Sequence, residues 1–448
     1  MREPCWLSIA ELARGYRERR FSAEGITRAC LERIARLEPT LNAFIAVTAD
    51  LALAQARRAD EEFKAGHWRG PLHGVPVALK DLIDVASVAT TAASRVLQSN
   101  VAVANAELVT RLQDAGAIIV GKNNLHEFAY GGSGVVSAHG PSRNPWDTAR
   151  ITGGSSSGSA AAVAAGCCYA AIGSDTAGSI RLPAAMCGVV GLKPTYGAVS
   201  LRGVVPLSPS LDHVGPITRT VGDARLVFEA MRDGAANASN GPVRLGVARA
   251  YFTDGVQPDV QQAFESAVAV AARFLGGEAV DVDVPVDDNR DLQKGESYQV
   301  HRQYLANPEL YDPETLRRIR TGEDIAVERI VELRLALEEF RRASLRVFDR
   351  VDVIATPATP LVAPRLEDLQ GKPELRPAEI LMLRNTRPFN VLGWPAISVP
   401  CGLSSEGMPV GLQLAAAPAN ESMLLSVAER FEAAAGFHFV PTPLRSGA

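Results

Sequence analysis

The sequence lacks the features that mark membrane and secreted proteins. Its longest apolar stretches, such as AAAVAAGCCYAAIG from Ala160, are shorter than the about 20 residues that a helix needs to cross a bilayer. The first residues, MREPCWLSIAELARGYRERR, contain no apolar core followed by a small-residue cleavage site, so they do not resemble a signal peptide. We therefore expect no membrane partner and a cytoplasmic location.

Metal-binding and nucleic-acid-binding patterns are missing as well. No two cysteines form a CxxC pair and no two histidines form an HxxxH pair, which leaves no recognisable metal-ligand spacing. Lys and Arg are scattered along a chain whose formal net charge is −4, so nothing indicates a basic patch for nucleic acid. We expect no metal, no cofactor and no nucleic-acid partner.

What the chain does contain is a large amount of core-forming sequence. Aromatic residues make up only 6%, but hydrophobic residues as a whole make up 47%, which is enough for a sizeable core. Strand-like and helix-like segments alternate, as in VRLGVAR, DVQQAFESAVAVAARFL and EAVDVDVP. We predict an α/β fold in which a mostly parallel or mixed β-sheet is covered by helices, and no obvious linker divides the chain. We expect N-terminal helices over about 1–65 and a charged helical segment over about 288–350.

Three short segments carry side chains suited to nucleophilic chemistry. Gly153 begins GGSSSGS, a Gly/Ser turn that leads into an apolar helix, and a second turn, DTAGS, begins at Asp175 after that helix. A tight connection after the helix would make the two turns face one another. Lys80 ends the apolar run PVALK and can project toward the same place. Each feature is weak alone, but their combination indicates a catalytic group.

Two other patterns compete with this interpretation. Gly116 to Lys122 fits the GxxxxGK opening of a phosphate-binding loop, but Asn123 follows instead of Ser or Thr, and the residues between the glycines look like a strand. Ser156 is the centre of a GxSxG match, but no acid and histidine stand in the context that a Ser–His–Asp hydrolase requires. We therefore favour neither a nucleotide-binding enzyme nor that type of hydrolase.

The chain resembles the amidase signature family. The resemblance rests on PLHGVPVALKDLIDV, GGSSSGSAAAVAAG, GSDTAGSIRLPAAMCGVVGLKPTYG and SLDHVGPITRTVGDA, and near the C-terminus on NVLGWPAISVPCG and MPVGLQL. It covers nearly the whole chain and implies a single large domain over residues 1–448 with the amidase signature fold, a central mixed, twisted β-sheet covered by helices on both faces. Within this domain it implies a catalytic core over about 66–220 and a variable helical segment over about 288–350. It also implies a Ser–cisSer–Lys catalytic group, with Ser179 as nucleophile, Ser155 as the bridging serine at a cis peptide and Lys80 as base. Ser157 and Ala177 replace glycines that many members have, and both keep the site small.

The chemistry explains why these residue types are used. A serine hydroxyl becomes a good nucleophile only when a base takes its proton. Lysine can be that base only when neutral, and burial can lower its pKa from about 10.4 by up to about 3–5 units. Asp175 and Arg181 flank the DTAGS turn. They can either orient the turn or form a purely structural ion pair, and the sequence leaves these two roles as equal alternatives. The resemblance implies an oxyanion hole from the backbone N–H groups of Thr176, Ala177, Gly178 and Ser179, with Ser156, Asp175 and Arg181 as supporting residues.

The sequence indicates the reaction class better than the substrate, because variable loops line the pockets of such folds. We expect hydrolysis of the C–N bond of a small amide, or of an ester or carbamate, through a seryl acyl-enzyme. No Arg/Lys cluster is visible, which favours an aryl or uncharged substrate. The sequence leaves open whether the chain forms a homodimer. Candidate pocket residues are Tyr130, Gly131, Gly132, Ser133 and His213, although packing is the plainer role for the histidine.

The alternative function is the glutamine amidase subunit of a tRNA-dependent amidotransferase. Such subunits have a glutamine-handling segment rich in Gly and Tyr. The corresponding residues 316–344 read LRRIRTGEDIAVERIVELRLALEEFRRAS, which lacks it. The sequence therefore favours a stand-alone hydrolase.

Overall fold

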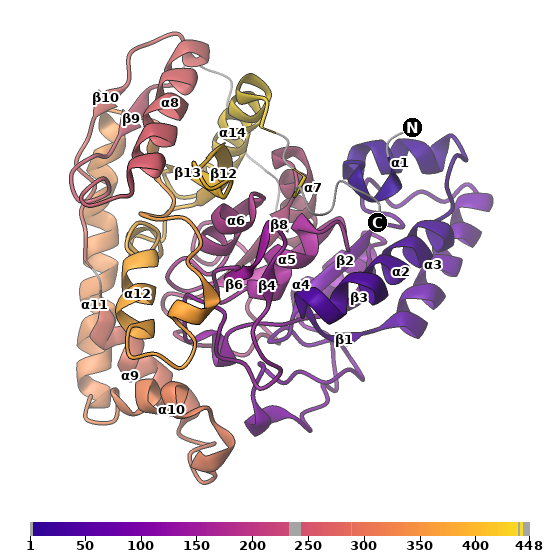
Figure 1. Cartoon of the computed structure of the whole chain (residues 1–448), viewed down its shortest axis with the longest axis horizontal. Coiled ribbons are helices and arrows are strands. Elements are labelled where there is room, and N and C mark those ends of the chain that lie inside the picture. The colour runs from indigo at the N-terminus through magenta and orange to yellow at the C-terminus, as the bar shows by residue number, and fades with distance from the viewer. Residues whose placement is uncertain (1–2, 233–242, 288, 438–439, 442–448) are drawn as a thin grey trace.

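A continuous eleven-stranded sheet forms the centre of the molecule (Figure 1). The computed structural model describes residues 3–232, 243–287, 289–437 and 440–441. The sheet joins strands from both halves of the chain, which confirms the predicted single-domain α/β architecture. In spatial order the strands are β1 (Phe44–Val47), β3 (Ile118–Asn123), β2 (Pro76–Lys80), β6 (Ala170–Asp175), β8 (His213–Thr218), β7 (Val190–Lys193), β12 (Ala396–Leu403), β13 (Pro409–Ala416), β11 (Val353–Pro357), β9 (Leu245–Val247) and β10 (Val280–Asp281), and β4 (Arg143–Asn144) pairs separately with β5 (Asp147–Ile151).

The sheet is mixed, as predicted from the sequence. β3, β2 and β6 are parallel to one another, as are β10, β9 and β11, while the strands from β6 to β11 are joined in antiparallel pairs. Because β2 and β6 are parallel neighbours, their last residues, Lys80 and Asp175, lie at the same edge of the sheet. Ligands of α/β sheets bind beyond the carboxyl ends of the strands, so this edge is the expected place for a site.

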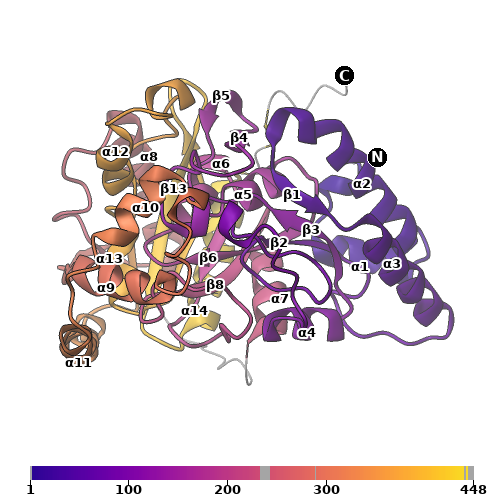
Figure 2. The same cartoon turned by 90° about the horizontal axis from the view of Figure 1, so that it is seen from below.

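Helices cover both faces of the sheet. They are α1 (Ile9–Arg17), α2 (Ala23–Leu41), α3 (Ala49–Lys64), α4 (Glu107–Asp114), α5 (Ser157–Ala164), α6 (Arg181–Cys187), α7 (Val221–Met231), α8 (Pro258–Leu275), α9 (Arg290–His301), α10 (Pro313–Arg320), α11 (Val327–Ser344), α12 (Leu375–Met382), α13 (Arg387–Val391) and α14 (Glu421–Ala435). α5 and α6 lie on one face, and α4, α7 and α14 lie on the other (Figure 2). In the described part of the chain, no helix is both long and apolar enough to span a bilayer.

The N-terminal region is helical with one exception that the sequence did not reveal. α1 begins after Ser8, whose Oγ accepts a hydrogen bond from the N–H of Glu11, while the Glu11 carboxylate accepts one from the N–H of Ser8. However, Phe44–Val47 form β1, an edge strand paired antiparallel with β3. The expectation of helices alone over residues 1–65 is therefore wrong at this strand. Four residues carry too short a pattern to predict a strand, and the pairing with β3 decides their conformation.

The charged segment near 288–350 forms α9, α10 and α11 where the structure describes it. These helices lie at the opposite end of the molecule from α1, α2 and α3 (Figure 1). The segment contributes directly to the site described below, because the first turn of α9 lines its cavity.

Candidate active site

Lys80 is a fully buried amine at the end of β2. Its Nζ donates to the Oγ of Ser155 at 2.6 Å and to the Oγ of Ser174 at 2.8 Å. Burial lowers the pKa of Lys80 from 10.5 to about 7, against the opposing effect of the Asp175 and Asp212 carboxylates. A large fraction of this side chain is therefore neutral near pH 7, and a neutral amine can accept a proton from Ser155.

The carboxylate next to Lys80 in the sequence is held by a different lysine. Asp81 Oδ1 lies 2.8 Å from Nζ of Lys122, and Asp81 Oδ2 accepts a hydrogen bond from the N–H of Thr91 at 2.9 Å. Lys122 is the lysine of the GxxxxGK match, and it lies within β3 rather than in a phosphate-binding loop. Among the described residues Lys80 forms no ion pair, so the only carboxylates that stabilise its ammonium form are those of Asp175 and Asp212, which do not contact it directly.

The GGSSSGS turn places its first two serines at the end of the sheet. The Gly154–Ser155 peptide bond is cis, as the family resemblance implied. The Ser156 N–H donates to the Ser179 carbonyl at 3.2 Å, and the Gly154 N–H donates to the Gly132 carbonyl at 2.7 Å. The Ser156 Oγ donates to the carbonyl of Ser174 at 3.2 Å. The two turns that the sequence expected to face one another are thus in direct contact.

Asp175 organises the DTAGS turn through its carboxylate. Oδ1 accepts from the N–H of Gly178 at 2.7 Å, and Oδ2 accepts from the N–H of Ile180 at 3.1 Å. The Gly178 N–H is thus used within the turn, which corrects the expectation that it serves an oxyanion hole. In the described structure the N–H groups of Thr176, Ala177 and Ser179 donate to no protein acceptor, so all three are available to an oxyanion.

Arg181 holds Asp175 from the other side in a fully buried network. Its Nε and Nη2 lie 3.0 and 2.9 Å from the two Asp175 carboxylate oxygens, and its Nη1 donates to Gln413 Oε1 at 2.7 Å. Burial alone would raise the pKa of Asp175, but the charge and hydrogen bonds of Arg181 outweigh it and hold this pKa below its ordinary value. The pair is therefore both the buried ion pair and the orienting device that the sequence left as alternatives.

A second buried carboxylate holds the same turn at Thr176. Asp212 Oδ1 accepts from the Thr176 hydroxyl at 2.6 Å, and its Oδ2 accepts from the N–H groups of Leu207 and Ser208 at 2.9 and 3.0 Å. Burial raises the pKa of Asp212 to about 6 in spite of these hydrogen bonds. Sequence reasoning missed this residue, although it stands within the SLDHVGP motif.

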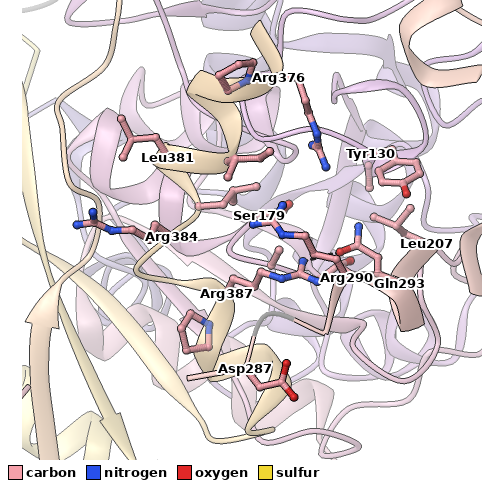
Figure 3. Close-up of a pocket in the computed structure, with 18 of the residues that line it drawn as sticks. Tyr130, Ser179, Leu207, Asp287, Arg290, Gln293, Arg376, Leu381, Arg384 and Arg387 are labelled. Carbon is pink, nitrogen blue, oxygen red and sulfur yellow. Dashed lines mark hydrogen bonds between the residues drawn. The ribbon is translucent and has the colours of Figure 1, made fainter. Parts of the chain in front are cut away.

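A cavity of about 330 Å³ opens beside the DTAGS turn. Thr176, Ala177 and Ser179 form one part of its wall, and Tyr130 and Gly131 form another, as predicted. The polar side chains around these residues are shown in Figure 3. The remaining lining residues are Ala129, Leu207, Tyr251, Val286, Asp287, Arg290, Gln293, Arg376, Pro377, Ile380, Leu381, Leu383, Arg384, Arg387 and Pro388.

Three of the predicted pocket residues do not line the cavity. Gly132 packs against the side chain of Leu383, and the Ser133 hydroxyl donates to the buried Glu379 carboxylate at 2.6 Å. His213 is buried, with Nδ1 2.7 Å from the Leu211 carbonyl, and burial lowers its pKa well below the ordinary value. All three residues thus pack outside the cavity lining. For His213 this is the packing role that the sequence favoured.

The cavity also contains an arginine cluster that the sequence did not reveal. Arg290, Arg376 and Arg387 gather around Ser179, whereas the guanidinium group of Arg384 points away from the others (Figure 3). Arg376 and Arg387 come from the consecutive helices α12 and α13, whereas Arg290 comes from α9, which is far from them in the chain. The expectation of an uncharged substrate does not fit this lining. In the described structure, no group of three His, Cys, Asp or Glu side chains could hold a metal ion.

Comparisons with known proteins identify the family to which this chain belongs. The Amidase family model matches residues 25–425. The chain is 38% identical to a glutamyl-tRNA(Gln) amidotransferase subunit of Chloroflexus aurantiacus, over 93% of this chain and 94% of the relative. Its structure is similar to that of the native peptide amidase of Stenotrophomonas maltophilia, with 29% identity, a TM-score of 0.81 and coverage of 97% of this chain and 98% of that one.

A second solved structure is more similar still in backbone. It belongs to a vestigial protein complex that reveals the evolutionary origins of an s-triazine catabolic enzyme, with 33% identity, a TM-score of 0.87 and coverage of 97% of this chain and 100% of that one. The family model and these likenesses extend over nearly the whole chain and include every motif that carried the resemblance. This protein therefore belongs to the amidase signature family of amidohydrolases.

Proposed function

We propose that this protein hydrolyses an amide with Ser179 as nucleophile, Ser155 as proton relay and Lys80 as base. The observation that carries this proposal is the 2.6 Å hydrogen bond between Lys80 Nζ and Ser155 Oγ in a fully buried site. The pKa of Lys80, about 7, makes the base available at neutral pH. A binding protein with a dead site would be expected to have lost one of these three residues, and all three are present.

The reaction begins with a proton relay. Neutral Lys80 takes the proton of the Ser155 hydroxyl, Ser155 takes that of Ser179, and the Ser179 oxygen forms a bond to the amide carbonyl carbon. The N–H groups of Thr176, Ala177 and Ser179 stabilise the negative oxygen of the tetrahedral intermediate. The proton then returns through Ser155 to the leaving nitrogen, the C–N bond breaks and an acyl-enzyme remains. Water, deprotonated along the same route, releases the carboxylic acid.

L-Glutamine is the first substrate that we propose. The support is the name of relatives that are 38% identical over 93% of this chain, which are subunits of glutamyl-tRNA(Gln) amidotransferases. In that role the chain would release ammonia from glutamine for a second protein of the same complex. The arginine-lined cavity also suits a substrate with a carboxylate.

A stand-alone hydrolase of a small amide, ester or carbamate is the second candidate. Residues 316–344 lack the Gly/Tyr-rich segment of the amidotransferase subunits. The likeness to a peptide amidase at a TM-score of 0.81 also supports a stand-alone enzyme on this fold.

The test measures ammonia or nitroaniline release from L-glutamine, butyramide and a p-nitroanilide by the wild type and by Ser179→Ala. The variant should lose turnover on every substrate and keep the melting temperature of the wild type, because a single hydroxyl contributes little to packing. Fastest turnover of glutamine supports the amidotransferase-type role, and fastest turnover of another compound supports the stand-alone role. Turnover that persists in Ser179→Ala would falsify the assignment of the nucleophile.

A further inference from the structure

We propose that the arginine cluster binds a carboxylate on the acyl part of the substrate, so that the enzyme selects short monoamides of dicarboxylic acids. This inference rests on the proposed function, because it assumes that Ser179 attacks the amide end. Glutaramate and L-glutamine both belong to this class. Among the described residues that line the cavity, four are arginines and one, Asp287, carries a carboxylate. The lining therefore favours an anionic ligand.

Arg387 is held in a fixed position for this task. Its side chain is almost fully enclosed, with a relative exposure of 7% for the residue, and its Nη1 donates to Oε1 of Gln293 at 2.5 Å. The bond joins the start of α13 to the first turns of α9. A guanidinium group that is already ordered loses little freedom when it binds a carboxylate through two parallel hydrogen bonds.

Arg376 adds a second guanidinium group with only part of a counter-charge. Its Nη1 lies 3.6 Å from Oε2 of Glu379, but that same carboxylate oxygen lies closer, at 2.7 Å, to Nη1 of Arg318. Arg376 thus shares the Glu379 carboxylate with Arg318, which is also paired with Glu314 at 2.8 Å. Burial lowers the pKa of Arg376, and the charge of Arg318 lowers it further. A substrate carboxylate in the cavity would relieve this repulsion between the two arginines.

The apolar part of the cavity wall determines which kind of chain can lie between the amide and the carboxylate of the substrate. Leu207, Ile380 and Leu381 line the cavity together with Ala177 and Pro388. Such a wall suits a short aliphatic chain between the reacting amide and the carboxylate. A cavity of about 330 Å³ lies at the lower end of the range for small-molecule sites, which favours a short acid over a peptide.

The experiment compares glutaramate with pentanamide, in which a methyl group replaces the carboxylate. We expect kcat/KM for glutaramate to be about 10- to 150-fold higher, the range that charge-assisted hydrogen bonds supply. Arg376→Gln and Arg387→Gln should lower kcat/KM for glutaramate far more than for pentanamide and so remove most of this preference. The matched control is Arg302→Gln, which removes the same charge from an exposed position at the end of α9 and should preserve the preference.

Binding of glutaramate to the Ser179→Ala protein, measured by calorimetry, separates this inference from the proposed function. Binding that weakens in the Arg376→Gln background supports the carboxylate site even if the wild type turns over no amide. Equal kcat/KM for glutaramate and pentanamide, or a preference unchanged in both arginine variants, would overturn the inference and leave the catalytic assignment intact. Arg376 has a partly exposed side chain, so its variant remains a test if Arg387→Gln fails to fold.

Discussion

Lowering the pH should inactivate this enzyme through protonation of Lys80. The amine is fully buried and hydrogen-bonded to Ser155 and Ser174, and its pKa is about 7 instead of the ordinary 10.5. Only the neutral amine can take a proton from Ser155. The rate constant kcat/KM should therefore rise with pH up to the pKa and become constant above it.

The size of the effect follows from the pKa. A pKa of about 7 leaves roughly half of the amine neutral at pH 7, roughly a tenth at pH 6 and roughly a hundredth at pH 5. Turnover at pH 5 should thus be lower than at pH 8 by roughly two orders of magnitude. With the ordinary pKa of 10.5, only roughly one lysine in three thousand would be neutral at pH 7. Burial therefore contributes roughly three orders of magnitude to the amount of active base.

The assay is a profile of kcat/KM for glutamine or another accepted amide between pH 5 and pH 9, with folding checked by circular dichroism at each pH. Protonation of Asp212 is the other possible cause of an acid limb, because this carboxylate accepts a hydrogen bond from Thr176 and has a pKa of about 6. If Lys80 sets the acid limb, Asp212→Asn should keep the limb but move it to lower pH, because the Asp212 charge raises the pKa of Lys80. A flat profile from pH 5 to pH 8, or an acid limb that disappears in Asp212→Asn, would refute the assignment of Lys80.

Three further predictions concern the turn and the absence of a metal requirement. Arg181→Met leaves the buried Asp175 carboxylate without its ion pair, so the free energy of unfolding, measured by guanidinium denaturation, should fall by about 3–5 kcal/mol. A fall of less than about 1 kcal/mol would contradict the importance of this network. Gly178 has φ +133°, and an added Cβ would lie 1.9 Å from Thr386 Oγ1. Gly178→Ala should therefore lower both kcat and the melting temperature. The control is Gly197→Ala, which should leave kcat unchanged because the space around Gly197 is open. Dialysis against EDTA should leave kcat unchanged, because the proposed reaction uses side chains alone, and a loss restored by added Zn²⁺ would contradict this.

The local motifs predicted the parts of the site that lie close together in the sequence. Ser155, Asp175, Ser179 and Arg181 stand within one serine turn, a short helix, a strand and a second turn, so the sequence itself limits how far apart they can lie. The alternation of strands and helices likewise predicted a mostly parallel or mixed sheet covered by helices, because hydrophobic periodicity is a local property of each segment. Lys80 could be placed because it ends an apolar strand, although its approach to Ser155 depends on the parallel pairing of β2 and β6.

Only the tertiary structure decided the features that join distant segments. Arg290 stands far from Arg376 and Arg387 in the sequence, and the three form one cluster because α9 meets the consecutive helices α12 and α13 at the same cavity. The pairing of Asp81 with Lys122 depends on strand neighbours, and it leaves Lys80 without an adjacent carboxylate. Reaction class follows from residue types at short spacing, which the chain itself constrains. The charge of the substrate site follows from contacts between remote helices, which no local pattern encodes.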